Sequence, residues 1–236
     1  MKNKRKAWFR GYKNFMKLFK KPTNFVYLGE KIQSPSVVLS NHVGTNGPLS
    51  FELYLDEPMR FWGAYEMNNG LRSMYKYQTQ VFYHEKRGWN IHLARLYCLL
   101  ATPLTNIFYR GLNLISTYKD SRFIKTLKES YQAIKDGYNI ILFPEMSDEG
   151  YFDQLKGFHQ GFVLLLDYCH KKGIDLPVVV TYYHKKSNVH MIDNPIMYSE
   201  IIKNCKTFEE VAKFLCDRCN ELGRICQDNY LNSKNK

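Results

Sequence analysis

Two short apolar runs, each followed by a polar corner, constrain the fold of this chain more than any other feature. Residues 36–40 lead into His42, and residues 139–143 lead into Glu145. Both runs are rich in β-branched residues, which predicts buried strands. Parallel strands end at the same edge of a sheet, where α/β proteins gather their reactive groups. The sequence therefore predicts one site that contains a histidine and a carboxylate.

The rest of the chain alternates between strand and helix patterns, which predicts an α/β fold with a mainly parallel central sheet flanked by helices. We expect further strands at residues 24–28, 60–65, 114–118, 176–183 and 188–192. We expect helices from residue 47, at 120–137, 157–172 and 207–230, and a mostly helical stretch over 71–107 that is broken near Gly88 and Pro103. A chain of 236 residues suits one domain with a sizeable core.

The net charge of +12 belongs mainly to one end of the chain. Residues 1–21 hold nine Lys or Arg and no acid, which leaves 25 basic against 22 acidic residues in residues 22–236. Aromatic residues from Trp8 to Phe19 recur there at helical spacing, opposite the cations. This pattern is typical of a basic amphipathic helix in a membrane interface, although a helix docked on the protein's own core would show it too. A nucleic-acid partner is not expected, because the body lacks a basic stripe.

We therefore divide the chain into an interfacial helix, residues 1–21, and one α/β domain, residues 22–236. Neither a secretion signal nor an apolar run of roughly 18–20 residues is recognised. We expect a peripheral protein on the cytoplasmic face of a membrane, with anionic lipid as its partner. Cys216 and Cys219 fall in a helical pattern, where small buried side chains are favoured over a zinc site. No metal or cofactor is expected.

Four blocks of this sequence resemble the glycerolipid acyltransferases, the glycerol-3-phosphate and lysophosphatidic acid acyltransferases. Asn41-His42 is similar to the first block of that family, and Phe143-Pro144-Glu145 to the third. Residues 111–119 resemble the second block, and residues 176–180 the fourth. Gly161 matches the glycine that usually follows the third block. The blocks occur in the family's order over residues 37–183.

The resemblance implies transfer of a fatty acyl group from acyl-CoA or acyl carrier protein to a hydroxyl of a glycerolipid precursor. His42 would be the general base, and backbone N–H groups around Gly44 and Gly47 would stabilise the oxyanion. Lys119 would contact an acceptor phosphate and Glu145 the acceptor hydroxyls. The substrate-binding set implied by the resemblance consists of Glu145, Lys119, Asn41, Ser147 and Pro144.

The chain also departs from the family pattern. The family's first block places an aspartate five residues after the histidine, where this chain has Gly47. Asn46, Glu52, Glu145 or a backbone carbonyl would have to orient the imidazole instead. Met146 replaces a glycine, and Asp148 stands where an arginine is common. A catalytically impaired relative that binds lipid or an acyl carrier is therefore the alternative function. A scaffold for unrelated partners is a third hypothesis.

Overall fold

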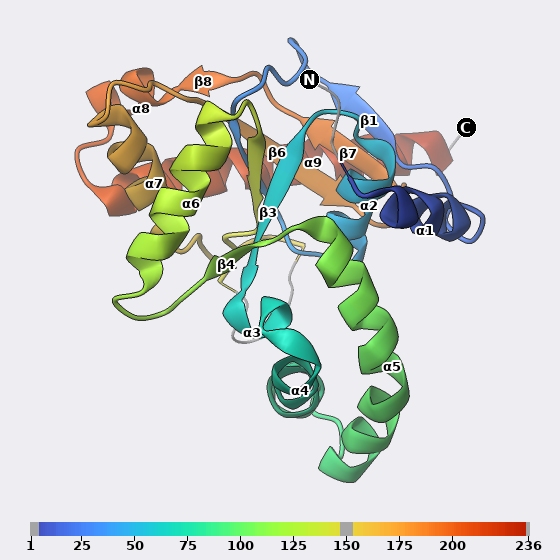
Figure 1. Ribbon diagram of the computed structural model, residues 1–236. Coiled ribbons are helices and arrows are strands. Elements are labelled where there is room, and N and C mark those ends of the chain that lie inside the picture. The colour runs from blue at the N-terminus through green and yellow to red at the C-terminus, as the bar shows by residue number, and fades with distance from the viewer. Residues whose placement is uncertain (1–4, 147–152, 235–236) are drawn as a thin grey trace.

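The computed structural model describes residues 5–146 and 153–234 and contains one twisted sheet between two helical layers (Figure 1). Its strands run in the order β1-β7-β6-β2-β5-β3-β4, with β8 paired to β6. The strands are β1 (Asn24–Tyr27), β2 (Val37–Ser40), β3 (Met59–Ala64), β4 (Ile115–Thr117), β5 (Asn139–Leu142), β6 (Pro177–His184), β7 (Val189–Ile192) and β8 (Ile196–Met197). All described pairings are parallel except β6–β7 and β6–β8. The predicted mainly parallel α/β fold is confirmed.

The central strands are buried on both faces, as continuous apolar runs require. The helices are α1 (Ala7–Lys17), α2 (Asn46–Tyr54), α3 (Tyr65–Asn68), α4 (Gly70–Lys76), the π-helix η1 (Tyr77–Glu85), α5 (Ile91–Leu112), α6 (Phe123–Lys135), α7 (Gly161–His170), α8 (Tyr198–Asn204) and α9 (Phe208–Lys234). On β2, Val37 and Leu39 face the layer formed by α6, α7, α8 and α9. Val38 faces α1, α2 and the end of α5. This alternation is the period of two that a strand imposes.

The expected N-terminal helix is present as α1, and it is docked on the protein. Phe9 is fully buried and its ring lies 5.9 Å from that of Phe108. Arg5 and Lys13 form ion pairs with the buried carboxylate of Glu52, at 2.7 and 2.9 Å. Other aromatic residues of this segment, including Phe15, remain exposed. Part of its apolar face therefore belongs to the core.

The segment between β3 and β4 forms a helical projection, which we define as residues 65–112. Figure 1 shows α3, α4 and the greater part of α5 beyond the end of β3, away from the two helical layers. The break predicted near Gly88 is present, because this residue lies between η1 and α5 with a left-handed φ of +66°. The break predicted at Pro103 is wrong, since α5 continues through it. Thr102, before the proline, bonds to Gln78 of η1, and Asn106, after it, contacts Met74 of α4, which holds the helix in place despite the missing N–H.

Two further differences from the expected elements lie near the sheet. The helix predicted from residue 157 begins at Gly161, because Phe158 forms an isolated β-bridge with Glu145 instead. The short elements β8 and α8 were not predicted from the sequence.

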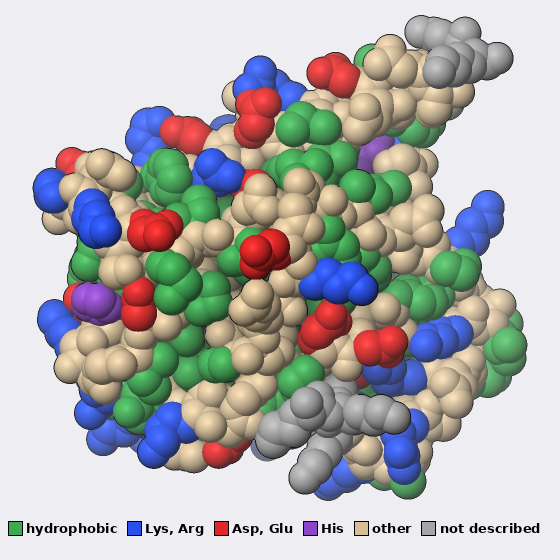
Figure 2. Space-filling model, turned by 90° about the horizontal axis from the view of Figure 1, so that it is seen from above, with side chains coloured by type: hydrophobic (Ala, Val, Ile, Leu, Met, Phe, Trp, Pro, Cys, Tyr) green, Lys and Arg blue, Asp and Glu red, His purple; other side chains and the backbone are tan. Residues whose placement is uncertain are grey.

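Seen from above, at the end of the molecule opposite the projection, cationic and acidic side chains are interspersed (Figure 2). Within the described residues, no helix has the length and apolar character needed to cross a membrane.

Candidate active site

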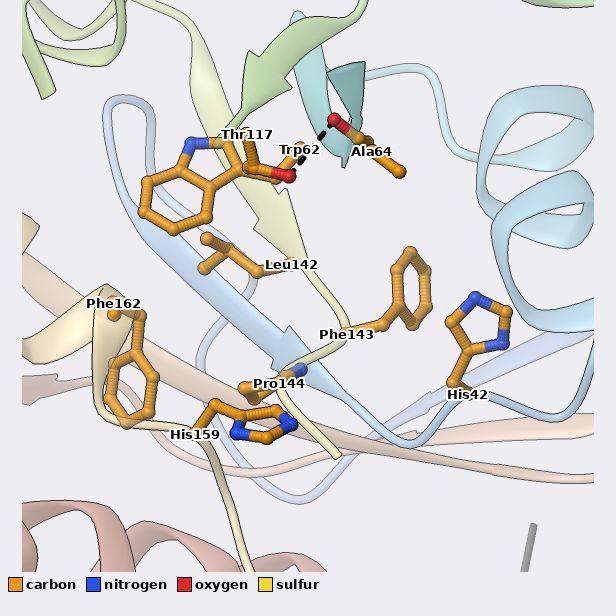
Figure 3. A pocket seen from close by; sticks show the side chains of 11 residues that line it. His42, Trp62, Ala64, Thr117, Leu142, Phe143, Pro144, His159 and Phe162 are labelled. Atoms are coloured by element: carbon orange, nitrogen blue, oxygen red, sulfur yellow. Dashed lines mark hydrogen bonds between the residues drawn. The ribbon is translucent and has the colours of Figure 1, made fainter. Parts of the chain in front are cut away.

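The two predicted corners meet at one cavity of about 290 Å³ at the carboxyl edge of the sheet (Figure 3). His42 comes from the end of β2, Phe143 and Pro144 from the end of β5, and Thr117 from the end of β4. The remaining lining residues belong to β3, to β5, to the start of α7 and to the segment that leads into it: Trp62, Gly63, Ala64, Leu142, His159, Gly161 and Phe162. A cavity walled by aromatic and aliphatic groups, with a few polar atoms, is the usual form of a small-molecule site.

Asn41 locks the end of β2 to β6. Its side-chain Oδ1 accepts from the backbone N–H of Tyr183 at 2.7 Å, and its Nδ2 donates to the carbonyl of Tyr183 at 3.1 Å. The amide thereby imitates one more residue of the β2–β6 ladder, and it is almost fully buried. Because its neighbour in sequence is His42, this double hydrogen bond positions the start of the turn that carries the imidazole.

Glu145 ties the end of β5 to the same turn. Its buried Oε2 accepts from the backbone N–H of His42 at 2.8 Å. On the main chain, the Pro144 carbonyl accepts from the N–H of His159 at 2.7 Å, and the Met146 N–H donates to Gly157 at 3.0 Å. The carboxylate therefore joins the two predicted segments through a charge-assisted hydrogen bond, which is about twice as strong as a neutral one.

The His42 imidazole is partly buried and packs edge-on against the Phe143 ring, with centroids 5.2 Å apart. Burial, and to a smaller extent the nearby Lys86 cation, lower the pKa of His42 from 6.5 to about 4. The imidazole is consequently neutral at physiological pH, which is the state in which it can accept a proton.

The turn after His42 leads directly into α2. Gly44 has a φ of +57°, the left-handed region, and its N–H donates to the His42 carbonyl at 2.7 Å. Gly47 is buried in the first turn of α2, and a Cβ added there would lie 3.4 Å from the Asn41 carbonyl and 3.5 Å from the Phe143 ring. The N-terminus of α2 thus faces the edge that carries the imidazole, where its dipole favours negative charge.

Glu52, one of the residues considered for orienting the imidazole in place of the family's aspartate, has another role. Glu52 is fully buried within α2, and its carboxylate is bound by Arg5 and Lys13. It neutralises the two cations of the N-terminal segment, Arg5 and Lys13, as a buried carboxylate requires. Glu145 remains attached to the turn through the His42 backbone.

The remaining residues predicted for the site are not among the described residues that line the cavity. Lys119 is exposed and is absent from the cavity lining, whereas Thr117, two residues earlier, lines it and donates to the Gly63 carbonyl at 3.0 Å. Ser147 lies outside the described residues. Sequence reasoning missed His159, which lies across the Phe143–Pro144 segment from His42 (Figure 3). Its position beside Gly161, in the segment already compared with the family, was the available signal.

Among residues 5–146 and 153–234, no cluster of three or more His, Cys, Asp or Glu is arranged to hold a metal ion. The thiols of Cys216 and Cys219 are buried in α9, and burial raises the pKa of both. The Cys219 thiol contacts the carbonyl of Thr181 at 3.3 Å. These side chains act as small members of the core.

The fold and the site define an α/β protein in which a neutral histidine, a helix N-terminus and an apolar cavity meet at the carboxyl edge of the sheet. No protein-family model matches the chain, and no curated protein sequence matches it. Among solved structures, the chain is similar to the 1-acyl-sn-glycerophosphate (LPA) acyltransferase PlsC from Thermotoga maritima. The two are 13% identical, with a TM-score of 0.49, and the match covers 93% of this chain and 89% of that one.

Proposed function

We propose that this protein is an O-acyltransferase that moves a fatty acyl group from acyl-CoA or acyl carrier protein to a hydroxyl of a lysophosphatidic-acid-type acceptor. The observation that carries the proposal is the hydrogen bond between the His42 N–H and Glu145 Oε2. It joins the segments that resemble the first and third family blocks at one apolar cavity. A residue of the second block, Thr117, lines the same cavity.

In the proposed reaction, the neutral His42 imidazole takes the proton of the acceptor hydroxyl as the hydroxyl oxygen attacks the thioester carbonyl. The carbonyl oxygen becomes negatively charged next to the N-terminus of α2. Because the N–H groups of Gly44 and Asn46 are already bound within the turn, those of Thr45 and Gly47 stabilise this oxygen. The carbon–sulfur bond then breaks, the ester forms, and the imidazolium returns its proton to the thiolate. The reaction balances with one ester and one free thiol as products.

The roles of the surrounding residues are part of this proposal. Glu145 and Asn41 hold the catalytic turn and border the acceptor, and Pro144 closes the cavity beside them. Ser147 and Lys119 are assigned to acceptor hydroxyl and phosphate binding from the sequence resemblance. We place the enzyme peripherally on the cytoplasmic face of a membrane with anionic lipid, and assign it no nucleic-acid partner.

A non-catalytic protein that binds lipid or an acyl carrier is the second candidate. It is favoured by Gly47, which leaves the family's aspartate position without a carboxylate, and by Glu52, which is engaged with two cations. The same cavity would then bind an acyl group without turning it over.

Release of free thiol from acyl-CoA, with lysophosphatidic acid as acceptor, tests the two candidates. We expect the wild type to release thiol in proportion to the ester formed, and His42→Ala to be slower by at least about 10²-fold. His170→Ala, a change at a histidine outside the cavity, should transfer at the wild-type rate. Equal rates for His42→Ala and the wild type would refute the base assignment. Acyl-CoA binding without thiol release would favour the second candidate.

A further inference from the structure

Helix α5 presents a long apolar face to the outside of the molecule. Leu93, Leu96, Leu100, Leu104 and Ile107 recur at three- and four-residue intervals, which places them on one side of the helix. All five are exposed, and Leu100 retains 73% of its accessible surface. We call these five residues the leucine face. A continuous exposed apolar surface of this kind marks an interaction site.

The opposite side of the same helix is buried and carries two polar side chains among small apolar ones. The Thr102 hydroxyl donates to the Gln78 side-chain oxygen at 2.8 Å, and both residues are buried. Asn106, also buried, contacts the Met74 sulfur at 3.9 Å. A helix packed in water would turn its leucines inward and its amides outward. The reversed arrangement indicates that the leucine face meets an apolar medium.

The net charge of the helical projection indicates which apolar medium the leucine face meets. The helical projection, residues 65–112, contains six Lys or Arg and two acids, Glu66 and Glu85, and α5 itself contains no acid. Aromatic rings gather where α5 begins, with Trp89 and Tyr97 both exposed and 5.5 Å apart. An exposed leucine face with amphipathic aromatic rings, on a segment with a net positive charge, is typical of an element that binds an anionic lipid surface. At the opposite end of the molecule, acids and cations are mixed (Figure 2).

We propose that the leucine face of α5 docks the protein on an anionic bilayer and that the acceptor lipid reaches the cavity from there. A second copy of the chain fits less well, because pairing two such faces would bring two cationic surfaces together. The projection also reaches the candidate site. Arg87, in the loop before α5, has its Nη2 only 3.9 Å from where a side-chain carbon on Gly44 would lie.

This inference deepens the proposed function and rests on it for the identity of the lipid substrate, while the docking itself is measured separately. Sedimentation with vesicles of phosphatidylcholine and phosphatidylglycerol, free of thioester and lysolipid, measures docking alone. Transfer to a soluble short-chain acceptor without vesicles measures the chemistry alone. If the protein is not an acyltransferase, transfer to the soluble acceptor will be absent, while sedimentation with vesicles will remain.

The test variant is Leu93→Gln/Leu96→Gln/Leu100→Gln, and its matched control is Leu164→Gln/Leu231→Gln, two exposed leucines on α7 and α9. We expect the test variant to bind these vesicles at least about tenfold more weakly than the wild type, because three leucines no longer enter the lipid. The control should bind like the wild type. Circular dichroism and thermal unfolding establish that each variant is folded.

The variant Phe15→Gln/Phe19→Gln distinguishes docking through α5 from docking through the N-terminal segment. The exposed aromatic residues of that segment also lie among Lys and Arg in the sequence. Weaker binding of the leucine variant supports the proposal whether or not the phenylalanine variant also weakens. Unchanged binding of a folded leucine variant would overturn it. A wild type that does not bind vesicles would overturn it as well, in favour of self-association if the leucine variant is a smaller oligomer in light scattering.

Discussion

The fully buried His190 makes the stability of this protein depend on pH in a way that can be calculated. Its ring lies among Phe25, Phe51 and Tyr183, with centroids 4.2 to 5.1 Å away, and its Nε2 is 2.6 Å from the Ser50 hydroxyl. Burial lowers the pKa of His190 from 6.5 to about 3. The folded protein therefore keeps this ring neutral under conditions in which the unfolded chain protonates it.

The direction and size of the effect follow from proton linkage. Between pH 6.5 and about 3, the unfolded state binds a proton at His190 that the folded state does not. The free energy of unfolding therefore falls by about 1.4 kcal/mol for each pH unit of acidification in this window, and by about 5 kcal/mol over all of it. His42, with its pKa lowered to about 4, adds a second proton of the same sign between pH 6.5 and 4.

Urea unfolding of the wild type and His190→Phe between about pH 4.5 and 6 tests this reasoning. His190→Phe changes the packing at every pH. The slope of its free energy of unfolding against pH should nevertheless be smaller by about 1.4 kcal/mol per unit, because one proton is no longer taken up on unfolding. His190→Gln should show the same reduced slope. His92→Gln, at an exposed position on α5, should keep the wild-type slope. Equal slopes of the free energy of unfolding against pH for the wild type and His190→Phe would refute the inference that His190 is neutral in the folded protein.

Three further predictions concern the site and α1. Because His42 must be neutral to accept a proton and its pKa is about 4, kcat/KM should be constant above about pH 5 and fall tenfold per unit below about pH 4. Gly47→Asp should raise the pKa of His42 and move this acid limb upward, whereas Gly47→Asn should leave it in place; equal profiles would contradict a carboxylate role there. Phe9→Ala should lower the free energy of unfolding by about 3 to 5 kcal/mol, and the exposed Phe15→Ala by less than about 0.5 kcal/mol, in urea titrations.

The sheet and the location of the site were predictable because their signals are local. Short β-branched runs at 36–40 and 139–143 suffice to predict two buried strands, and parallel pairing brings their ends together. The bonds within the site are not local. Glu145 reaches the His42 backbone across 103 residues, and Ser50 meets His190 across 140. No spacing rule in one sequence predicts which buried partner such a group selects.

Amphipathic periodicity defines a face of a helix, and tertiary contacts decide what that face meets. In α1, the same aromatic pattern supplies Phe9 to the core and leaves Phe15 exposed, because only the first lies over the end of α5. In α5, the apolar face points outward, and the evidence for this is the buried hydrogen bond from Thr102 to Gln78. An apolar helix face can therefore be left for a partner surface, as we propose for the leucine face, only when the polar groups behind it have partners inside the protein. The leucine face meets that condition, because the buried Thr102 hydroxyl behind it donates to Gln78. Without that partner, the buried hydroxyl would destabilise the fold by about 1 to 3 kcal/mol.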